Sequence, residues 1–291
     1  MRHRRLGPGG PEVSATGYGG MHLSIDGRPD ENTAVQVIHA ALDAGVTLID
    51  TADSYCLSDE DTGHNERLIA KALREWSGPR NDVIVATKGG IVRPQGRWER
   101  NGRPEHLRRA CDRSLRNLGV ERIALYQFHA PDPEVPFRES VEAIAELAAE
   151  GKVRWVGLSN VSVEQIELAR SITPIMTVQN RLNPFFREAL KEGVVSHCAE
   201  QGIGFLAYSP TGGGRLTRKL PGHPALASIA SRHEVSGHAV VLAWLLAQAP
   251  VVIPIPSART VAHALDSAGA SEVELNEEEA EAISKAEFSR A

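Results

Sequence analysis

Short apolar runs rich in Val, Ile and Leu alternate along the chain with longer stretches of helical periodicity. Runs of this kind, bounded by Gly, Pro, Asn or Asp, are typical of strands that are buried on both faces. Each is followed by a helical stretch, which is the pattern of repeated βα units around a parallel sheet. The pattern predicts eight strands, at 14–18, 46–50, 83–87, 123–128, 153–158, 175–179, 203–207 and 251–254.

The helical stretches between these strands carry start and stop signals. Pro104 stands in the first turn of one stretch, and Gly45, Gly119 and Gly151 stand just after the ends of others. Helices are predicted at 33–44, 64–76, 104–118, 137–149, 162–171, 188–200 and 259–268, with two more at 224–233 and 236–247 before the last strand and one at 276–287.

Eight strands alternating with helices over this length predict an α/β protein, a closed (β/α)8 TIM barrel. An open Rossmann-like sheet is the alternative, but no G-x-G-x-x-G opens a helix after the first strand. No linker, low-complexity tract or charge block divides the chain. We therefore expect one domain over residues 1–291, with an N-terminal extension over about 1–13 and a C-terminal helix over about 276–287.

Composition limits the class of function. The 291 residues are 42% hydrophobic and 24% charged, which fits a soluble chain with a large core. The net charge of -5 and the scattered Lys and Arg argue against nucleic acid as a partner. MRHRRLGPGG lacks the apolar run of a signal peptide, and no segment approaches a membrane span, so we expect a cytoplasmic protein that does not bind membranes. Cys56, Cys111 and Cys198 share no close spacing, which argues against disulfides and a zinc site.

Polar residues follow almost every predicted strand. Active sites in this architecture lie on the loops after the C-terminal ends of the strands. The second, third and fourth strands are followed by Asp50 with Tyr55, by Lys88 and by His129. Later strand ends carry Ser159 with Asn160, Gln179 with Asn180, Tyr208 with Ser209, and Pro254 through Ser257.

The first four residues fit proton transfer to a carbonyl oxygen. A free phenol has a pKa of about 10 and is a weak acid at neutral pH, but a nearby ammonium lowers that value. Lys88 can supply the ammonium if Asp50 is its counter-ion, and His129 can orient the same carbonyl. Each residue alone has an ordinary structural explanation, such as a strand terminus or a loop cap. Their positions after consecutive strands favour a common site.

Several segments in order along the chain carry a resemblance to a known family. They are LIDTADSY (48–55), GHNERLIAKAL (63–73), VATK (85–88), YQFHAPDP (126–133), GKVRWVGLSN (151–160), VQNRLNP (178–184), GFLAYSP (204–210) and IPIPSART (253–260). With these segments the chain resembles the aldo-keto reductases nearly from end to end. The resemblance implies that Tyr55 is the proton donor, that Lys88 and Asp50 lower its pKa, and that His129 orients the substrate carbonyl.

The resemblance also implies a nicotinamide cofactor, which supplies the hydride, and no metal. In relatives the nicotinamide amide is held at the positions of Ser159, Asn160 and Gln179, and the ring stacks on the position of Tyr208. Asp50 is expected to contact the cofactor as well. Gly20 and Met21 match a loop that approaches cofactor and substrate. The loop expected to wrap the pyrophosphate contains Ser209, Pro210, Thr211, Gly212 and Gly213.

The segment PSARTVAHALDS (256–267) matches the part of the family that binds the adenosine end. Arg259 near a helix N-terminus suits a 2′-phosphate, with Ser257 as a supporting donor and Asp266 further along the helix. These residues favour NADPH (NADP+). Relatives often have Arg or Gln where His263 stands, and Asn where Ser267 stands, so the strength of the preference stays open.

The substrate is expected to be a small or aromatic carbonyl compound. Met21, Tyr55, Trp98 and His129 are the predicted substrate-binding residues, and Cys56, Leu57 and residues near Phe128 and Phe186 are expected to line the pocket. The spacing is similar to bacterial aldehyde and pyridoxal reductases.

Two other functions stay open and two are disfavoured. A pyridoxal reductase or pyridoxine dehydrogenase within the same family, or a non-catalytic cofactor-sensing subunit, are the main alternatives. A Schiff-base aldolase would use Lys88 but leaves Tyr55 and Asp50 without roles. A metal-dependent hydrolase lacks an H-x-H pair after an early strand. We expect a monomer or a weak homo-oligomer.

Overall fold

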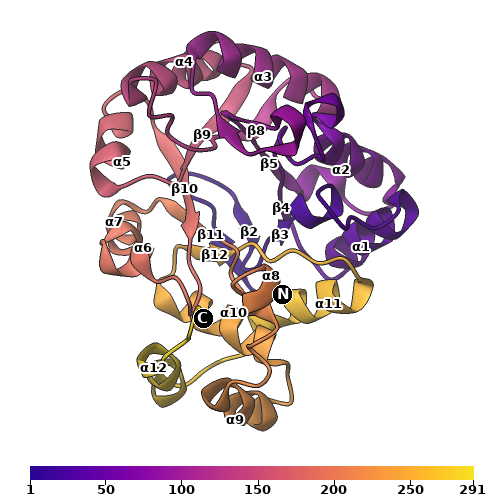
Figure 1. Cartoon of the computed structure of the whole chain (residues 1–291), viewed down its shortest axis with the longest axis vertical. Coiled ribbons are helices and arrows are strands. Elements are labelled where there is room, and N and C mark those ends of the chain that lie inside the picture. The colour runs from indigo at the N-terminus through magenta and orange to yellow at the C-terminus, as the bar shows by residue number, and fades with distance from the viewer.

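The structure, a computed structural model, describes residues 1–291. Eight parallel strands pair in chain order and curl around a common axis, and helices surround them (Figure 1). The predicted (β/α)8 barrel is therefore confirmed. Its strands are β3 (Tyr18–Gly19), β4 (Leu48–Asp50), β5 (Ile84–Gly89), β8 (Ile123–Phe128), β9 (Val153–Ser159), β10 (Ile175–Arg181), β11 (Gly204–Tyr208) and β12 (Val252–Pro254).

Backbone hydrogen bonds close the barrel between its first and last strands. The N–H of Gly17 donates to the carbonyl of Pro254 at 2.9 Å, and the N–H of Gly19 donates to that of Pro256 at 2.8 Å. The two segments approach so closely that a Cβ on Gly19 would lie 2.8 Å from the carbonyl oxygen of Ile255. Glycine is needed here because any side chain would push this seam apart.

The helices form the outer layer, and their ends follow the capping rules. Asp30 accepts a hydrogen bond from the N–H of Thr33 at the start of the first helix, and Gly119 ends the third in a left-handed conformation. The α-helices are α1 (Glu31–Asp43), α2 (His64–Glu75), α3 (Pro104–Leu118), α4 (Phe137–Ala149), α5 (Val163–Arg170), α6 (Glu188–Lys191), α7 (Val194–Gln201), α8 (Gly214–Thr217), α9 (Pro224–His233), α10 (Gly237–Gln248), α11 (Val261–Gly269) and α12 (Glu277–Lys285). Short 3-10 turns are η1 (Met21–Leu23), η2 (Asp59–Asp61), η3 (Arg80–Asp82), η4 (Pro94–Gly96) and η5 (Ala270–Glu272). None of these helices has the length and apolar character that crossing a lipid bilayer requires.

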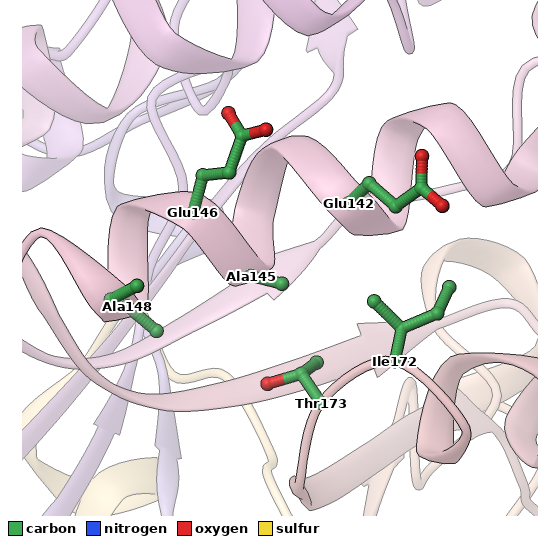
Figure 2. A pocket seen from close by; sticks show the side chains of 7 residues that line it. Glu142, Ala145, Glu146, Ala148, Ile172 and Thr173 are labelled. Atoms are coloured by element: carbon green, nitrogen blue, oxygen red, sulfur yellow. The ribbon is translucent and has the colours of Figure 1, made fainter.

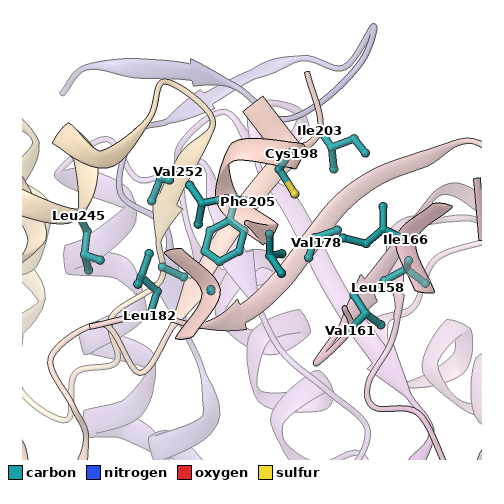
Figure 3. Close-up of a cluster of buried hydrophobic side chains, with 14 of the residues drawn as sticks. Leu158, Val161, Ile166, Val178, Leu182, Cys198, Ile203, Phe205, Leu245 and Val252 are labelled. Carbon is teal, nitrogen blue, oxygen red and sulfur yellow. The ribbon is translucent and has the colours of Figure 1, made fainter. Parts of the chain in front are cut away.

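The apolar core lies in two layers. Between strands and helices, Val178 and Phe205 of neighbouring strands face Ile166, Cys198 and Leu245 of the helices (Figure 3). Inside the barrel a smaller cluster fills the end opposite the strand carboxyl ends, made of Leu6, Val13, Leu48, Ala86, Leu125, Met176, Leu206, Ile253 and Ile255. Because this end is filled with apolar side chains, the polar site is restricted to the other end.

The N-terminal part differs from the prediction for the first strand. The run expected at 14–18 is divided: β2 (Glu12–Ser14) pairs antiparallel with β1 (His3–Arg5), and the barrel strand is β3 alone. The β1–β2 hairpin brings Leu6 and Val13 into the barrel interior, where both are fully buried. The sequence did not show this because the hairpin strands are only three residues long.

Two further elements differ from the sequence-based expectation. The helix expected at 188–200 is two helices, α6 and α7, because Gly193 adopts a left-handed conformation with φ of 76°. The connection after β5 contains a small antiparallel hairpin, β6 (Ile91–Val92) with β7 (Glu99–Arg100), which carries Trp98. The other predicted helices and strands lie within a few residues of their predicted bounds.

Candidate active site

Three side chains meet at the carboxyl ends of β4 and β5. Lys88 is fully buried, and its Nζ donates to Asp50 Oδ2 at 2.6 Å, to the carbonyl of Thr51 at 2.8 Å and to Tyr55 Oη at 2.9 Å. These contacts use all three donors of the ammonium group. Asp50 ends β4 and Tyr55 lies in the following loop, so the strand places the carboxylate and the loop returns the phenol to the same ammonium.

The second oxygen of Asp50 is held by two amides. Gln179 Nε2 donates to Asp50 Oδ1 at 2.7 Å, and Gln127 Nε2 donates to it at 3.2 Å. Gln127 was missed by the sequence analysis, although it is a polar residue inside the buried run IALYQF, and alternation along β8 would have placed it in the barrel interior. Its role is to fix the carboxylate that in turn holds Lys88.

His129 follows β8 and lies beside the phenol. Its ring centroid is 5.8 Å from that of Tyr55, and the two rings are nearly perpendicular. Its Nδ1 lies 3.4 Å from Ser54 Oγ, another residue that the sequence analysis missed. The Nδ2 of Asn160 donates to the His129 carbonyl at 3.0 Å, which holds this loop against the end of β9. His129 and Tyr55 are both buried, each with 7% of its surface exposed.

Burial sets the protonation of these groups. It raises the pKa of Tyr55 well above its ordinary value, and the nearby Asp50 carboxylate raises it further. Burial lowers the pKa of Lys88, while Asp50 opposes that change. Burial and the charge of Lys88 hold the pKa of His129 well below its usual range. The sequence-based expectation was that Lys88 and Asp50 together lower the pKa of Tyr55; in the structure the net direction is upward, because burial and the Asp50 carboxylate raise it.

The residues expected to hold the nicotinamide form a connected polar strip. Ser159 Oγ donates to the Gln179 carbonyl at 2.8 Å, and Asn160 Nδ2 donates to Ser159 Oγ at 3.1 Å. Tyr208 Oη donates to Asn160 Oδ1 at 2.8 Å, which fixes the Tyr208 ring at the end of β11. Asn160 has a φ of 59°, a left-handed conformation that places its amide between His129 and Tyr208.

The glycine-rich loop after β11 has an unusual backbone. Ser209, Gly212 and Gly213 all have positive φ, at 47°, 90° and 67°. Asn183 Nδ2 donates to the Ser209 carbonyl at 2.9 Å and anchors the start of the loop to the turn after β10. Pro210, which is buried, and Thr211, which is half-buried, connect Ser209 to the glycines.

The residues expected at the adenosine end make contacts within the protein. The guanidinium group of Arg259 donates to the carbonyls of His22 at 3.3 Å and Asp26 at 2.9 Å, in the loop between β3 and α1. Asp266 accepts a hydrogen bond from Ser236 Oγ at 2.7 Å, so it helps to start α10. These contacts give both residues structural partners that the sequence analysis did not anticipate. Gly20, Met21 and Ser257 lie nearby: Gly20 N–H donates to the Asp50 carbonyl at 2.8 Å, Met21 begins η1, and a Cβ on Gly19 would lie 3.0 Å from Ser257 Oγ.

Trp98 forms one wall beside Tyr55. It is 48% exposed, and its ring centroid lies 6.5 Å from that of Tyr55 in an edge-to-face arrangement. Leu57 is also partly exposed, at 37%. Cys56 is fully buried, which corrects the expectation that it lines the pocket, and Phe128, near which pocket residues were expected, is also fully buried. Phe128 instead packs in the core against Phe137, with ring centroids 6.0 Å apart.

The ring of Phe186 is covered by two arginines. The guanidinium carbons of Arg181 and Arg290 lie 3.7 Å and 4.0 Å from the ring centroid.

A separate hollow lies on the outside of the barrel, between α4 and the segment after α5 (Figure 2). Its lining residues are Glu142, Ala145, Glu146, Ala148, Ala149, Ile172 and Thr173, and none of them belongs to the barrel mouth.

Comparison with known proteins identifies the family and agrees with the fold. The model of the aldo/keto reductase family matches residues 15–287. A probable aldo-keto reductase from Glycine max is 34% identical, over 97% of this chain and 88% of its own. A glycerol dehydrogenase from Gluconobacter oxydans has a similar structure, with a TM-score of 0.82, 29% identity and coverage of 97% of this chain and 94% of that one. An aldo/keto reductase from Klebsiella pneumoniae, in complex with NADP and acetate, has a TM-score of 0.82, 25% identity and coverage of 98% and 95%.

The chain belongs to the aldo/keto reductase family. The family inferred from the sequence segments is thereby confirmed, and with it the class of oxidoreductases.

Proposed function

We propose that the protein reduces an aldehyde or ketone to an alcohol, with NADPH as hydride donor and Tyr55 as proton donor. The observation that carries the proposal is the buried contact of Lys88 Nζ with both Asp50 Oδ2, at 2.6 Å, and Tyr55 Oη, at 2.9 Å. A phenol at the mouth of a barrel, hydrogen-bonded to a buried ammonium, is suited to give its proton to a developing alkoxide.

The raised pKa of Tyr55 has a defined consequence for this reaction. The phenol holds its proton at neutral pH and is therefore ready to act as an acid. When the proton leaves, the oxygen gains negative charge 2.9 Å from Lys88 Nζ, and the ammonium stabilises that charge. Asp50 and its two amide donors keep Lys88 in place throughout, so the site needs little rearrangement during proton transfer.

His129 would orient the carbonyl oxygen. Its low pKa keeps the imidazole neutral at ordinary pH, so it carries one proton on one ring nitrogen. If Ser54 Oγ donates to Nδ1, the proton is on Nε2, where it is available to a substrate oxygen between His129 and Tyr55. Two donors then converge on one oxygen.

The residues present fit NADPH. Gln179 and Asn160 offer amide groups, and Tyr208 is held by Asn160 with its ring available for stacking. The positive φ values at Gly212 and Gly213 allow the backbone to come close to a pyrophosphate. Arg259, which contacts the loop between β3 and α1, supplies a charge suited to a 2′-phosphate. NADPH supplies the hydride when it is bound. The NADP found with the Klebsiella pneumoniae structure supports this choice.

The wall formed by Trp98 and Leu57 favours substrates with an aromatic or apolar group attached to the carbonyl. The Trp98 ring lies edge-to-face with the Tyr55 phenol, so a flat substrate bound at Tyr55 would lie beside an aromatic ring on which it can stack. We therefore propose aromatic aldehydes as the substrate class, with pyridoxal among the compounds to be tested.

The test follows NADPH oxidation by absorbance with an activated aromatic aldehyde and, separately, with pyridoxal. Tyr55→Phe should lower kcat on the order of 100-fold or more while NADPH binding is retained. Tyr126→Phe is the matched control, because the Tyr126 hydroxyl is buried and has no hydrogen-bond partner. It should leave turnover unchanged.

Each outcome discriminates between functions. Unchanged turnover in Tyr55→Phe would refute its role as proton donor. A wild-type protein that binds NADPH tightly but reduces neither compound would favour a cofactor-sensing subunit over an aromatic aldehyde reductase.

A further inference from the structure

Arg93 is a buried arginine beside the proposed site that has no part in the reaction described above. Arg93 is 5% exposed. Its guanidinium group makes four hydrogen bonds to three backbone carbonyls. Nη1 donates to Cys56 at 2.7 Å, Nη2 donates to Leu57 at 3.3 Å and to Gly96 at 2.7 Å, and Nε donates to Gly96 at 3.0 Å.

These carbonyls belong to two different segments. Cys56 and Leu57 follow Tyr55 directly in the loop of residues 51–63, here called the Tyr55 loop. Gly96 lies at the tip of the hairpin of residues 90–101, here called the Trp98 hairpin. The Arg93 guanidinium carbon also lies 3.9 Å from the centroid of the Trp98 ring. One side chain therefore contacts both the loop that carries the phenol and the residue that forms the wall.

Arg93 forms no ion pair with an acidic side chain, and only carbonyl dipoles compensate its charge. A buried charge without a counter-ion is costly unless its donors are well satisfied. The planar fork of a guanidinium group can reach several carbonyls at fixed angles, which a lysine ammonium cannot do. The two segments also touch directly at the tip, where a Cβ on Gly96 would lie 3.1 Å from the Leu57 carbonyl oxygen.

We propose that Arg93 is a positioning residue that fixes the Trp98 wall relative to Tyr55 and thereby sets the preference for aromatic over small aliphatic carbonyl substrates. The inference rests on the proposed function of Tyr55. Without the guanidinium group, the Trp98 ring loses its stacking partner, and the Trp98 hairpin loses the Arg93 hydrogen bonds to the Tyr55 loop. The hydrogen bond from the Gln95 N–H to Asp59 Oδ1, at 3.3 Å, remains between the two segments. An aromatic substrate then loses one side of its binding site, whereas a small aliphatic substrate, which does not reach the wall, loses less.

The test compares Arg93→Ala with Arg97→Ala. Arg97 lies in the same hairpin, but its side chain is exposed and bonds only Glu99 and Gln95, so it is a matched control. For an aromatic aldehyde, kcat/KM should fall up to about 100-fold in Arg93→Ala, mainly through KM. For a short aliphatic aldehyde the loss should be about tenfold smaller, and Arg97→Ala should change neither.

A double-mutant cycle separates positioning from a general loss of structure. In a Trp98→Ala background the wall is already absent, so Arg93→Ala should no longer change the ratio of aromatic to aliphatic kcat/KM. Added guanidinium ion, at concentrations that leave the wild type unaffected, should partly restore aromatic activity to Arg93→Ala. If Arg93→Ala does not fold, Arg93→Lys carries the same comparison, with an intermediate loss expected because an ammonium cannot reach all three carbonyls.

The proposal is overturned if Arg93→Ala lowers activity equally for both substrates, or if the ratio changes as much in the Trp98→Ala background as in the wild type. Failure of the proposed function gives a different result, because the wild type itself would show no turnover. In that case cleavage by chymotrypsin after Trp98 still tests the contact: a rate equal in wild type and Arg93→Ala would show that Arg93 does not hold the hairpin.

Discussion

Replacing Lys88 by methionine removes a buried positive charge and leaves the Asp50 carboxylate without its ion partner. Both side chains are almost completely buried, at 0% and 3% exposure. Breaking a buried ion pair from one side costs about 3–5 kcal/mol. Gln127 and Gln179 still donate to the other Asp50 oxygen, so we expect the lower end, about 3 kcal/mol of unfolding free energy. At roughly 2–4 °C per kcal/mol for a chain of this size, Tm should fall by roughly 6–12 °C.

The double variant Asp50→Asn/Lys88→Met separates stability from catalysis. It removes the uncompensated carboxylate, so most of the lost stability should return. Turnover should stay on the order of 100-fold or more below wild type, because Tyr55 still lacks the ammonium that stabilises its charged form. Lys152→Met is the control: Lys152 pairs with Asp112 at 3.0 Å on the surface, and such pairs contribute about 0–1 kcal/mol.

Thermal unfolding followed by circular dichroism gives the stability, and NADPH oxidation gives the turnover. A Lys88→Met protein as stable as the wild type would refute the argument that the buried Asp50 carboxylate depends on Lys88. Recovery of turnover in the double variant would refute the role of Lys88 in supporting Tyr55.

Three further variants test other parts of the structure. Arg259→Ala should raise the Kd of NADPH about tenfold or more with little effect on the Kd of NADH. Fluorescence titration measures both values. An equal rise in both would mean that Arg259 acts through its contacts with His22 and Asp26 and not through the 2′-phosphate. Burial, reinforced by Arg113, lowers the pKa of His106 to about 4 from 6.5. Between these values the unfolded chain binds the proton and the folded chain does not, so unfolding free energy in urea should fall as pH drops from 6.5 to 4. His106→Gln should lack that part of the fall, and identical pH profiles would contradict the assignment. Gly204→Ala should lower stability by about 1–3 kcal/mol or more, because its Cβ would lie 1.8 Å from the carbonyl oxygen of Leu6; an unchanged Tm would show that the hairpin can move away.

The sequence was most informative where a charged residue stands at the end of an apolar run that is expected to be buried. Asp50 and Lys88 end apolar runs, and a charged residue at that position is unusual unless it has a partner. Their spacing by one βα unit placed them on neighbouring strands, and the structure brings them into contact. Gln127 was overlooked because an amide inside a strand looks like an ordinary polar residue until its neighbours are known.

Other properties of the site depend on three-dimensional distances that no local pattern contains. The pKa of Tyr55 depends on the balance between burial, Asp50 and Lys88, and a sequence gives no measure of burial at that position. The partners of Arg93 lie in a loop 36 and 37 positions away and in a turn three positions away, and no periodicity connects them. Asp266 was predicted to bind the cofactor from its segment, and its hydrogen bond to Ser236, which arises from the packing of α10 against α11, could not be predicted from that segment.

The seam that closes the barrel has a consequence for synthesis on the ribosome. Gly17 and Gly19 pair with Pro254 and Pro256, and the hydroxyl of Tyr18 bonds the carbonyl of Ala258, 240 positions later. A nascent chain can form its early βα units as they emerge, but it cannot close the sheet until the final strand leaves the exit tunnel. Until then β3 has an unpaired edge that can capture another strand. Contacts of such high sequence separation also slow the last step of folding, so chaperone dependence should be concentrated at the end of translation.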